Sequence, residues 1–417
     1  MTSGGLFAEP DFRRFWSAQV VSDFGSGVST LALPLTAVLW LNASAMEMGV
    51  LRALATTPVL LFALLAGVWV DRLPRRPILV IGNAGRGLLL LAVPAAAAAG
   101  TLRIELLWGV AFAVGVLTVV FDIAVTSYVP SLVGRAQLVR ANSTLQASSS
   151  AARVVGPGAA GLLVQLVGAP FAVVVDALSF FAGALWLGQL RAPEESGQLE
   201  RRGVGAEIVE GVVAVWRDPI LRAMVLATSI GSLGGAIQGA IFVLYATRDV
   251  GTPPETLGLV LACGSAAALA GAALAGPVSA RLGAGGAMVA GQATIALGSL
   301  LVLGATPGLP AAIVLAAAQA LMGGGLAVWS VTQLALRQAM TPPHLLGRVN
   351  ATRRLVVFGV QPFGGLLGGA LGEWVGLYAA LAVAAVVLVL CALAMALSPL
   401  RTATEPSPGG RGWPKAG

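Results

Sequence analysis

The sequence predicts an all-α membrane protein with twelve transmembrane helices in two pseudo-symmetric six-helix bundles. Composition is the first observation: of 417 residues, 57% are hydrophobic and 10% are charged, with a mean hydropathy of +0.88. Average globular chains carry about 25% charged residues, so this chain has too little polar material to cover a water-soluble core. The other observations are apolar segments that recur about every 30–35 residues and short basic connections between them.

A transmembrane helix needs about 20 apolar residues, and with short connections this chain length accommodates about twelve of them. The first six predicted spans are 13–41, 46–70, 78–99, 104–129, 141–167 and 169–190. The other six are 219–247, 254–280, 284–306, 309–336, 348–375 and 377–398. The first segment is too long for a signal-peptide core and contains Asp23, so we expect it to be retained as a span.

The placement of positive charge predicts the orientation in the membrane. When the N-terminus is assigned to the cytoplasm, 20 of the 25 Lys and Arg residues fall on the cytoplasmic side. Two fall outside (Arg103 and Arg248), and three fall within spans (Arg52, Arg86 and Arg153). This asymmetry is the positive-inside pattern. It predicts a multi-pass protein of the cell (cytoplasmic) membrane with both termini in the cytoplasm.

Several classes of function are excluded. No basic stripe with interleaved aromatic residues remains for nucleic acid. Cys263 and Cys391 fall inside apolar spans, which argues against a structural disulfide and a thiolate metal site. The only histidine, His344, follows Pro342 and Pro343 without a cysteine or carboxylate cluster nearby. The sequence has no phosphate-binding loop or nucleophile elbow, so we expect neither an enzyme nor a cofactor or metal site.

The chain is predicted to contain an N-terminal bundle (1–190), a polar cytoplasmic connection (191–218), a C-terminal bundle (219–398) and a disordered tail (399–417). The two halves share residues at a nearly constant offset of 209 or 208. The matched pairs are Gly25/Gly234, Gly49/Gly258, Gly67/Gly276, Arg72/Arg281, Arg140/Arg348, Asn142/Asn350, Gly156/Gly364, Gly161/Gly369 and Gly168/Gly376. Parallel six-span repeats are a known transporter plan, with the binding site between the repeats near mid-membrane.

The polar connection carries an apolar pattern of its own. Ile208, Val212, Val213 and Trp216 recur at helical spacing. This pattern is compatible with a short interfacial helix and equally with a solvated linker, and both interpretations remain open.

The connection Gly67-Val-Trp-Val-Asp71-Arg72-Leu-Pro-Arg75-Arg76 resembles the loop between spans two and three of the major facilitator superfamily, and the twelve-span plan extends the resemblance over the whole chain. The resemblance implies that Gly67 permits close helix approach. It also implies that Asp71 is attracted to the positive N-terminal end of span eleven, by about 0.3–1 kcal/mol, and latches the halves on the cytoplasmic side. Alternatively, Arg75 and Arg76 serve only as basic topology anchors.

Span five reads Gly156-Pro157-Gly158-Ala159-Ala160-Gly161, which is similar to the signature of antiporter branches in this superfamily. Small residues let helices approach closely and Pro157 bends the helix, so the resemblance implies a hinge; ordinary small-residue packing is the alternative. The segments 11–19, 128–133, 138–143 and 176–180 resemble the macrolide-efflux and enterobactin-exporter-type branch. Span four lacks the arginine that many drug–proton antiporters carry.

Charged residues within spans are costly and usually face a cavity or a partner. Asp23 and Arg153 lie about 15 and 18 Å deep from the same side, so their matching heights predict a charge pair. We expect Asp23, tuned by Arg153, to be the first proton-coupling candidate and Asp122 the second; a permanent structural ion pair is the alternative. Among the other charges, Asp176 and Arg52 are expected nearer the outer surface and Arg86 nearer the inner one.

The C-terminal half has few deep acids, and its candidate cavity residues are Gln238, Gln292, Gln319, Gln333 and Gln361. A cavity with few charges favours an apolar or amphipathic substrate, although any one glutamine can instead bond two helices. The sequence therefore predicts a monomeric secondary exporter of hydrophobic or amphipathic drug-like molecules, a multidrug-resistance antiporter that exchanges substrate for protons by alternating access. The alternatives are a dedicated exporter of one metabolite, such as a siderophore or self-made antibiotic, a lipid-translocating carrier, and uptake by symport.

Overall fold

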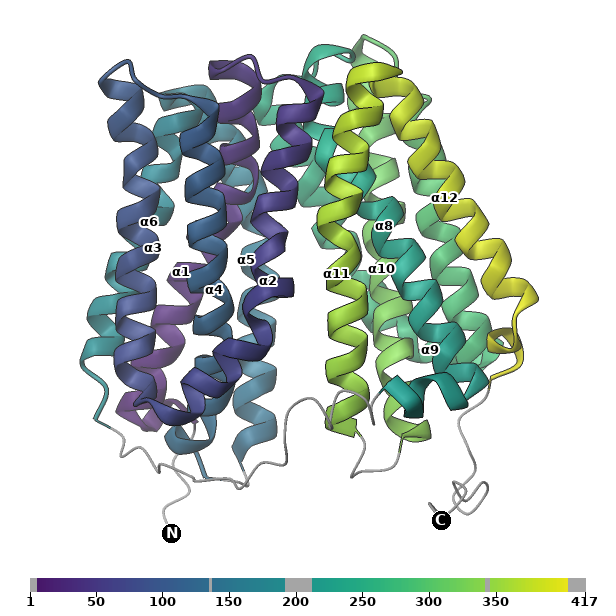
Figure 1. The fold of residues 1–417 in the computed structure, drawn as a ribbon, viewed down its shortest axis with the longest axis horizontal. Coiled ribbons are helices and arrows are strands. Elements are labelled where there is room, and N and C mark those ends of the chain that lie inside the picture. Colours follow the sequence, from purple (N-terminus) through teal and green to yellow (C-terminus); the bar gives the residue numbers. More distant parts are fainter. Residues whose placement is uncertain (1–5, 135–136, 192–211, 342–345, 404–417) are drawn as a thin grey trace. The chain divides into compact units, whose positions relative to one another are not determined.

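The computed structural model describes residues 6–134, 137–191, 212–341 and 346–403, which form helices and no strand (Figure 1). The first helices are α1 (Pro10–Leu35), α2 (Ala45–Arg72), α3 (Arg75–Ala98), α4 (Ile104–Leu132), α5 (Leu138–Val167) and α6 (Ala169–Gly188). They are followed by α8 (Pro219–Arg248), α9 (Pro254–Val302), α10 (Leu309–Met340), α11 (Leu346–Trp374) and α12 (Leu377–Leu397). Short helical turns are η1 (Leu6–Ala8), η2 (Thr36–Trp40) and η4 (Pro399–Thr402).

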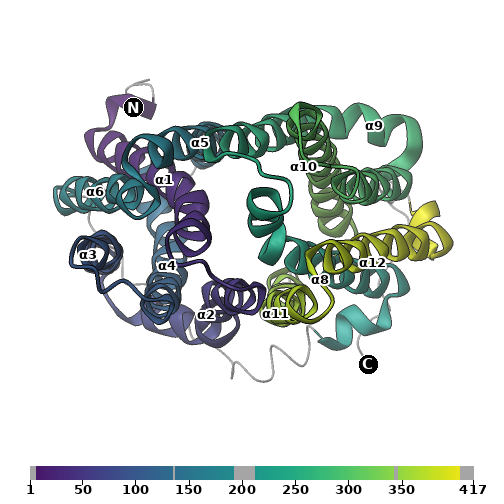
Figure 2. The same cartoon turned by 90° about the horizontal axis from the view of Figure 1, so that it is seen from above.

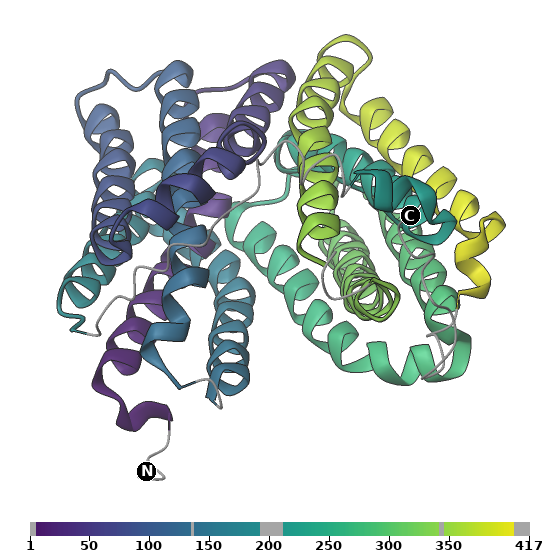
Figure 3. The same ribbon diagram turned by 60° about the horizontal axis from the view of Figure 1, so that its bottom comes forward.

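The long helix α9 consists of two transmembrane helices joined at Gly283. A single straight helix of 49 residues would be about 74 Å long, far more than the roughly 30 Å of a hydrocarbon core. Gly283 has φ 74° and ψ 162°, outside the helical region, and the green ribbon of the chain's middle part changes direction sharply between two helices (Figure 3). Glycine adopts such a conformation without steric cost. The two parts of α9 therefore correspond to the predicted spans 254–280 and 284–306.

The predicted fold class is confirmed. Within the described residues, ten helices are long and apolar enough to cross a membrane. That number treats α9 as one helix and leaves out α1, which carries Asp11, Arg13, Arg14 and Asp23. With α1 included and α9 divided at Gly283, the chain has the twelve predicted spans.

The predicted span boundaries differ from the helix ends by a few residues. The helices α5 and α10 each extend about a turn beyond the apolar run, because hydropathy marks the membrane-embedded part and not the helix end. One start has a clear local cause: Ser44 precedes α2 and forms a capping box with Glu47. The Ser44 amide donates to Glu47 Oε2 at 2.7 Å and the Glu47 amide donates to Ser44 Oγ at 3.3 Å, which satisfies two backbone donors at the helix start.

The chain packs as two compact units. Unit 1 comprises residues 1–199 and 243–262, and unit 2 comprises residues 200–242 and 263–417. Within unit 1, α1 packs against α5 and α6, α3 packs against α4 and α6, and α2 packs against α4 (Figure 2). The first residues of α9 thus belong with the N-terminal helices, although the polar connection precedes them in the sequence.

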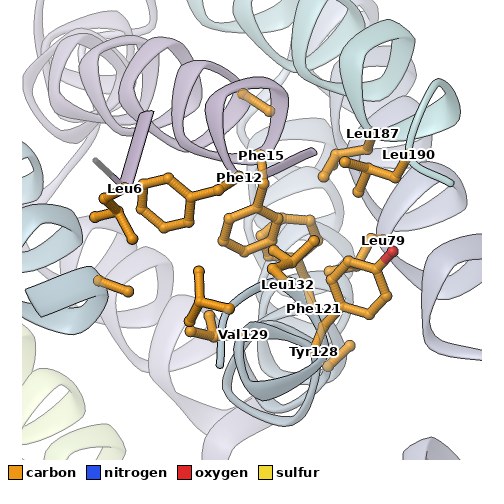
Figure 4. Packing of buried hydrophobic residues seen from close by; sticks show 14 of the residues in the cluster. Leu6, Phe12, Phe15, Leu79, Phe121, Tyr128, Val129, Leu132, Leu187 and Leu190 are labelled. Atoms are coloured by element: carbon orange, nitrogen blue, oxygen red, sulfur yellow. The ribbon is translucent and has the colours of Figure 1, made fainter. Parts of the chain in front are cut away.

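An apolar core closes unit 1 at the end where α1 and α3 begin and α4 and α6 end (Figure 4). The rings of Phe15 and Tyr128 lie 6.1 Å apart in this core. Just outside it, Asp11 accepts hydrogen bonds from the Arg14 side chain and from the Arg191 amide, each at 2.9 Å. These bonds fasten the start of α1 to the chain that leaves α6. The buried members of the core are Leu6, Phe12, Phe15, Ala18, Val70, Leu79, Phe121, Ala124, Tyr128, Val129, Leu132, Val133, Ala141, Leu187 and Leu190.

The end of unit 2 is closed differently, by the turn η4 that follows α12. The Gly285 amide donates to the Ala403 carbonyl at 2.9 Å. Leu400 is fully buried and packs in an apolar cluster that includes Leu221, Met288 and Met395. The segment after α12 is therefore held against the turn in α9.

We predict that Gly285→Ala releases this segment. A Cβ at Gly285 would lie 1.7 Å from the Leu400 carbonyl oxygen, so the backbone of η4 would have to move. Overpacking of this kind costs about 1–3 kcal/mol. We expect a lower unfolding temperature in detergent and faster proteolysis after Leu397. Gly276→Ala is the matched control, because a Cβ there meets no described atom within 4 Å; equal unfolding temperatures for the two variants would contradict the docking.

The polar connection is described only from residue 212. Residues 212–217 are helical, with Ala214 and Val215 buried against Val225 and Val349. Val212, Val213 and Trp216 are exposed on the same short helix. This amphipathic helix agrees with the interfacial-helix interpretation for these residues, whereas Ile208 lies outside the described residues.

Candidate functional site

A buried arginine on α3 occupies the middle of unit 1. The Arg86 side chain is 5% exposed. Its Nε donates to the Gly82 carbonyl at 3.2 Å, and its Nη2 donates to Asn83 Oδ1. The guanidinium carbon lies 4.1 Å from the ring centroid of Phe121 on α4 and 4.2 Å from that of Phe180 on α6. Two aromatic faces attract the cation within the bundle and fix its position between α3, α4 and α6.

Three carboxylates surround Arg86. Asp122 on α4, Asp176 on α6 and Asp23 on α1 all interact electrostatically with its guanidinium group. Asp176 is 2% exposed and accepts a hydrogen bond from Ser179 Oγ at 3.3 Å. Such an arrangement suits a charged group in a span, which needs a partner in place of water.

The sequence predicts Asp176 nearer the outer surface and Arg86 nearer the inner one, and it does not predict that the two groups interact electrostatically, as they do in the structure. One reason is that α3 begins at Arg75, three residues before the predicted span, so Arg86 is about 16 Å from the helix start. The second reason is the length of the arginine side chain, which carries the charge well away from its Cα.

Glycines create the room for this cluster. A Cβ at Gly25 on α1 would lie 2.1 Å from Ser179 Oγ and 2.7 Å from Asp176 Oδ1. A Cβ at Gly183 on α6 would lie 2.5 Å from Asn83 Nδ2 and 2.7 Å from Ser22 Oγ. Each glycine thus leaves a space that polar atoms of a neighbouring helix occupy.

Asp23 and Arg153, predicted as a charge pair, interact electrostatically in the structure without a direct ion pair. Within the described residues, the Arg153 guanidinium donates to two hydroxyls of its own helix, Ser149 Oγ at 3.0 Å and Ser150 Oγ at 3.1 Å. Ser149 lies beside the Asp23 carboxylate, and Arg153 acts on Asp23 only electrostatically. Arg153 points along α5 because these serines, three and four residues earlier, share its helix face. A serine therefore lies between the two charges.

The charges of the cluster do not balance. Asp23, Asp122 and Asp176 carry three carboxylates, whereas Arg86 and Arg153 supply two cations. Arg52, the other cation within an N-terminal span, has no recorded charge partner among the described residues. Asp122 and Arg153 are exposed, Asp23 is half-buried, and Arg86 and Asp176 are buried. With all groups ionised, these five side chains together carry one excess negative charge.

The segment 156–161 of α5 packs closely on two helices of unit 1. A Cβ at Gly156 would lie 2.6 Å from the Cα of Gly27 on α1. A Cβ at Gly161 would lie 2.5 Å from the Pro254 carbonyl oxygen and 3.1 Å from the Cα of Gly258, at the start of α9. A Cβ at Gly258 would in turn lie 2.5 Å from the Pro157 carbonyl oxygen. This backbone-to-backbone contact permits a helix to slide or pivot, as the hinge hypothesis requires.

The same close approach occurs in unit 2 at the repeat positions. A Cβ at Gly364 on α11 would lie 2.6 Å from the Cβ of Ala236 on α8. Gly156 and Gly364 are 208 residues apart and Gly27 and Ala236 are 209 apart. Residues related by the offset found in the sequence thus make equivalent helix contacts in the two halves. This supports the interpretation of the two halves as repeats.

We predict that Gly156→Ala disturbs unit 1. The new methyl group would meet backbone atoms of Gly27, which cannot rotate away, and overpacking costs about 1–3 kcal/mol. Unfolding temperature in detergent is the measurement. Gly109→Ala on α4 is the control because a Cβ there has no described atom within 4 Å. Unchanged stability of Gly156→Ala would contradict the close contact of α1 and α5.

The structure describes only some side chains of the predicted gate loop. A Cβ at Gly67 would meet no described atom within 4 Å, so this conformation does not contain the close approach implied for that glycine. The side chain of Asp71 lies outside the described residues. Arg72 is exposed, and Arg76 Nη2 donates to the Gly188 carbonyl at the end of α6. A cation is favourable at a helix C-terminus, so Arg76 has a structural role within unit 1 besides any role in topology.

The glutamines of unit 2 divide into two groups. Gln238 accepts a hydrogen bond from Ser299 Oγ at 2.6 Å, and its Nε2 lies 3.2 Å from Met322 Sδ. Gln333 Nε2 donates to Thr228 Oγ1 at 3.0 Å. These two side chains connect helices, as the alternative interpretation stated. Gln292 is buried with its Nε2 unpartnered, while Gln319 and Gln361 are half-buried.

The sequence alone did not reveal Arg86 and Asp176 as partners. Asp23 and Asp122 were predicted as proton-coupling candidates, whereas Arg86 and Asp176 were predicted only as separate charges at different depths. The signal that was available is the spacing of Asn83 and Arg86, three residues apart on one face of an apolar span. Which helices face α3 could not be obtained from that spacing.

Helical spans and a buried charge cluster in an apolar bundle define a membrane transporter class. The chain matches the family described as transmembrane secretion effector, MFS_3, over residues 3–415, and it belongs to this family of the major facilitator superfamily. It is therefore a multi-pass membrane protein, as predicted.

Individual relatives and a solved structure agree with this family. The chain is 31% identical to multidrug efflux pump Tap of Mycolicibacterium fortuitum, over 92% of this chain and 95% of that protein. It is 26% identical to enterobactin exporter EntS of Citrobacter koseri, over 97% and 95%. A bacterial homologue of the iron transporter ferroportin, solved in an inward-facing state, shares the fold with a TM-score of 0.78 at 16% identity, over 94% of this chain and 98% of that chain.

Proposed function

We propose that this protein exports apolar or amphipathic small molecules across the cell membrane, in exchange for protons, by alternating access. The observation that carries the proposal is the excess carboxylate in the cluster of Asp23, Asp122 and Asp176 around Arg86. An uncompensated charge in a dry bundle is costly, so a proton bound at this site is favoured when water is excluded. When the site becomes wet, the charged form is favoured again.

Within this mechanism, Asp23 is the proton carrier. It is half-buried, whereas Asp176 is enclosed by α6 and α1 and Asp122 is exposed. Asp23 lies beside Ser149 and within electrostatic reach of both Arg86 and Arg153. Its environment therefore depends on α1, α3 and α5 together, and a movement of α5 about the 156–161 segment changes that environment. The gate loop that contains Asp71 closes the cytoplasmic side, and both termini lie in the cytoplasm.

The export direction and the substrate class come from relatives that are named a multidrug efflux pump and an enterobactin exporter. A broad range of substrates is supported by the few fixed charges of unit 2, where Gln292, Gln319 and Gln361 offer hydrogen bonds. The second relative favours one alternative, a dedicated exporter of a single metabolite such as a siderophore. A lipid-translocating carrier is the other alternative. We propose that a single chain is sufficient for transport.

Uptake by inverted membrane vesicles tests the proposal. A panel of neutral and cationic amphipathic compounds is added to vesicles with and without a protonophore. We expect several compounds to accumulate in an energised vesicle, and the protonophore to abolish the accumulation. Accumulation of one compound alone would favour the dedicated exporter. Flipping of a labelled phospholipid in proteoliposomes, without uptake of any compound, would reject small-molecule export.

A further inference from the structure

Two arginines of unit 2 interact electrostatically with each other. Arg337 is in the last turn of α10 and is 5% exposed. Its Nη1 lies 3.5 Å from Gln333 Oε1, and among the described residues its Nε has no hydrogen-bond partner. Arg353 on α11 is half-buried, and its Nε is also buried and unpartnered. The charge recorded as acting on Arg337 is that of Arg353, another cation.

Two threonines add unpartnered hydroxyls at the same helix ends. Thr341 and Thr352 are each 4% exposed, and within the described parts of the chain neither Oγ1 has a hydrogen-bond partner. Thr341 is one turn beyond Arg337, because its amide donates to the Arg337 carbonyl at 3.0 Å. Thr352 precedes Arg353 on α11. A buried donor left without an acceptor costs about 1–3 kcal/mol, and like charges add to that cost.

The missing component is an acceptor with negative charge. Among the residues that the structure describes, no carboxylate pairs with Arg337 or Arg353, and the charges that act on them are those of Arg353 and Arg354, which are cations as well. A guanidinium group matches the geometry of a phosphate, to which it donates two parallel hydrogen bonds. Hydroxyl groups such as those of Thr341 and Thr352 can donate to the remaining phosphate oxygens.

We propose that the end of α10 and the start of α11 bind a phosphate group through Arg337 and Arg353, with Thr341 and Thr352 as further donors. The site lies at the predicted cytoplasmic ends of both spans, where the headgroups of anionic lipids are found. Basic pockets between transmembrane helices at this level bind such headgroups. The phosphate can come from a lipid or from solution, and the two sources share the chemistry that the arginines recognise. The proposal does not depend on proton coupling.

Thermal unfolding of the full chain in a maltoside detergent, which contains no phosphate, tests the site and separates the two sources. In the first arm, inorganic phosphate is titrated into the detergent solution, with sodium chloride added to hold ionic strength constant. In the second arm, phosphatidylglycerol is added to the detergent and inorganic phosphate is omitted. Stabilisation in the first arm identifies free phosphate as a ligand, and stabilisation in the second identifies the lipid headgroup. If neither arm shows stabilisation, the proposal is overturned. The partner of the two arginines would then be an acid of the chain itself.

Substitutions make the assignment specific. Arg337→Gln and Arg353→Gln should each raise the phosphate or lipid concentration for half-maximal stabilisation about tenfold or more, since each loses charged hydrogen bonds. Arg281→Gln is the control, because Arg281 is an exposed arginine of the same unit. Phosphate also stabilises proteins generally by exclusion from their surface, so equal stabilisation of Arg337→Gln and the unchanged protein would contradict the site.

A second measurement distinguishes loss of the phosphate site from misfolding of the Arg337→Gln variant. In the maltoside detergent without lipid or phosphate, Arg337 is an uncompensated buried cation, so Arg337→Gln should unfold at the same or a higher temperature than the unchanged protein. A marked loss of stability under these conditions would show that Arg337 already has a partner, and it would overturn the proposal.

Discussion

Asp23→Asn is expected to abolish proton-driven accumulation of substrate while leaving downhill exchange intact. Asparagine keeps the size and hydrogen-bonding capacity of the side chain but cannot bind and release a proton. The helix contacts around it are unaffected, because α1 is held to α5 and α6 by glycine packing at Gly25 and Gly27. The measurement compares uphill accumulation in energised proteoliposomes with exchange of labelled for unlabelled substrate at equal concentrations on both sides.

Two further variants make the result specific to the cluster. Asp249→Asn removes an exposed carboxylate that follows α8 and should leave both activities unchanged. Asp23→Glu keeps the carboxylate and should retain part of the uphill activity. Uphill accumulation by Asp23→Asn at the level of the unchanged protein would remove Asp23 from the coupling role and transfer attention to Asp122.

Arg86→Met should strongly destabilise unit 1. The substitution removes the buried cation that interacts electrostatically with the buried Asp176, and a buried charge left without compensation is strongly destabilising. It also removes the attraction to the rings of Phe121 and Phe180, at 4.1 and 4.2 Å. We expect a lower unfolding temperature in detergent and a reduced yield of folded protein in the membrane.

The double variant Arg86→Met with Asp176→Asn separates charge from packing. With both buried charges removed, neither is left uncompensated, so the second substitution should restore much of the stability that the first removes. A double variant as unstable as Arg86→Met would show that the rings and helix packing around Arg86 dominate. Stability of Arg86→Met equal to that of the unchanged protein would contradict the central position of this arginine.

The fold could be predicted because the lipid bilayer permits few kinds of structure. Twelve apolar segments in a chain with few charges leave little choice besides membrane helices, and Pro and Gly in the connections mark where they end. The break at Gly283 agrees with the predicted spans 254–280 and 284–306, although the two helices join without a loop. Boundaries such as the end of α10 at Met340 were less accurate, because a helix can extend beyond the apolar run.

The candidate site could be predicted only in part. An acid in a span is recognisable from the sequence alone, so Asp23 and Asp122 were identified. The partner of each acid depends on which helices are neighbours and on how far a long side chain reaches. Depth along each helix suggested Arg153 for Asp23, but depth does not specify the face, and Arg153 bonds to Ser149 and Ser150 on its own helix. The role of Arg86 follows from the contacts of α3 with α4 and α6, which no spacing within α3 reveals.

Proton movement driven by substrate tests the central claim most directly. The purified chain is reconstituted into liposomes that contain a pH-sensitive dye, and a compound that accumulates in vesicles is added outside without any imposed gradient. Exchange of protons for substrate predicts that the lumen becomes more alkaline as the compound enters, and that Asp23→Asn shows no such change. Uptake of the compound with an unchanged luminal pH would contradict proton antiport by this cluster.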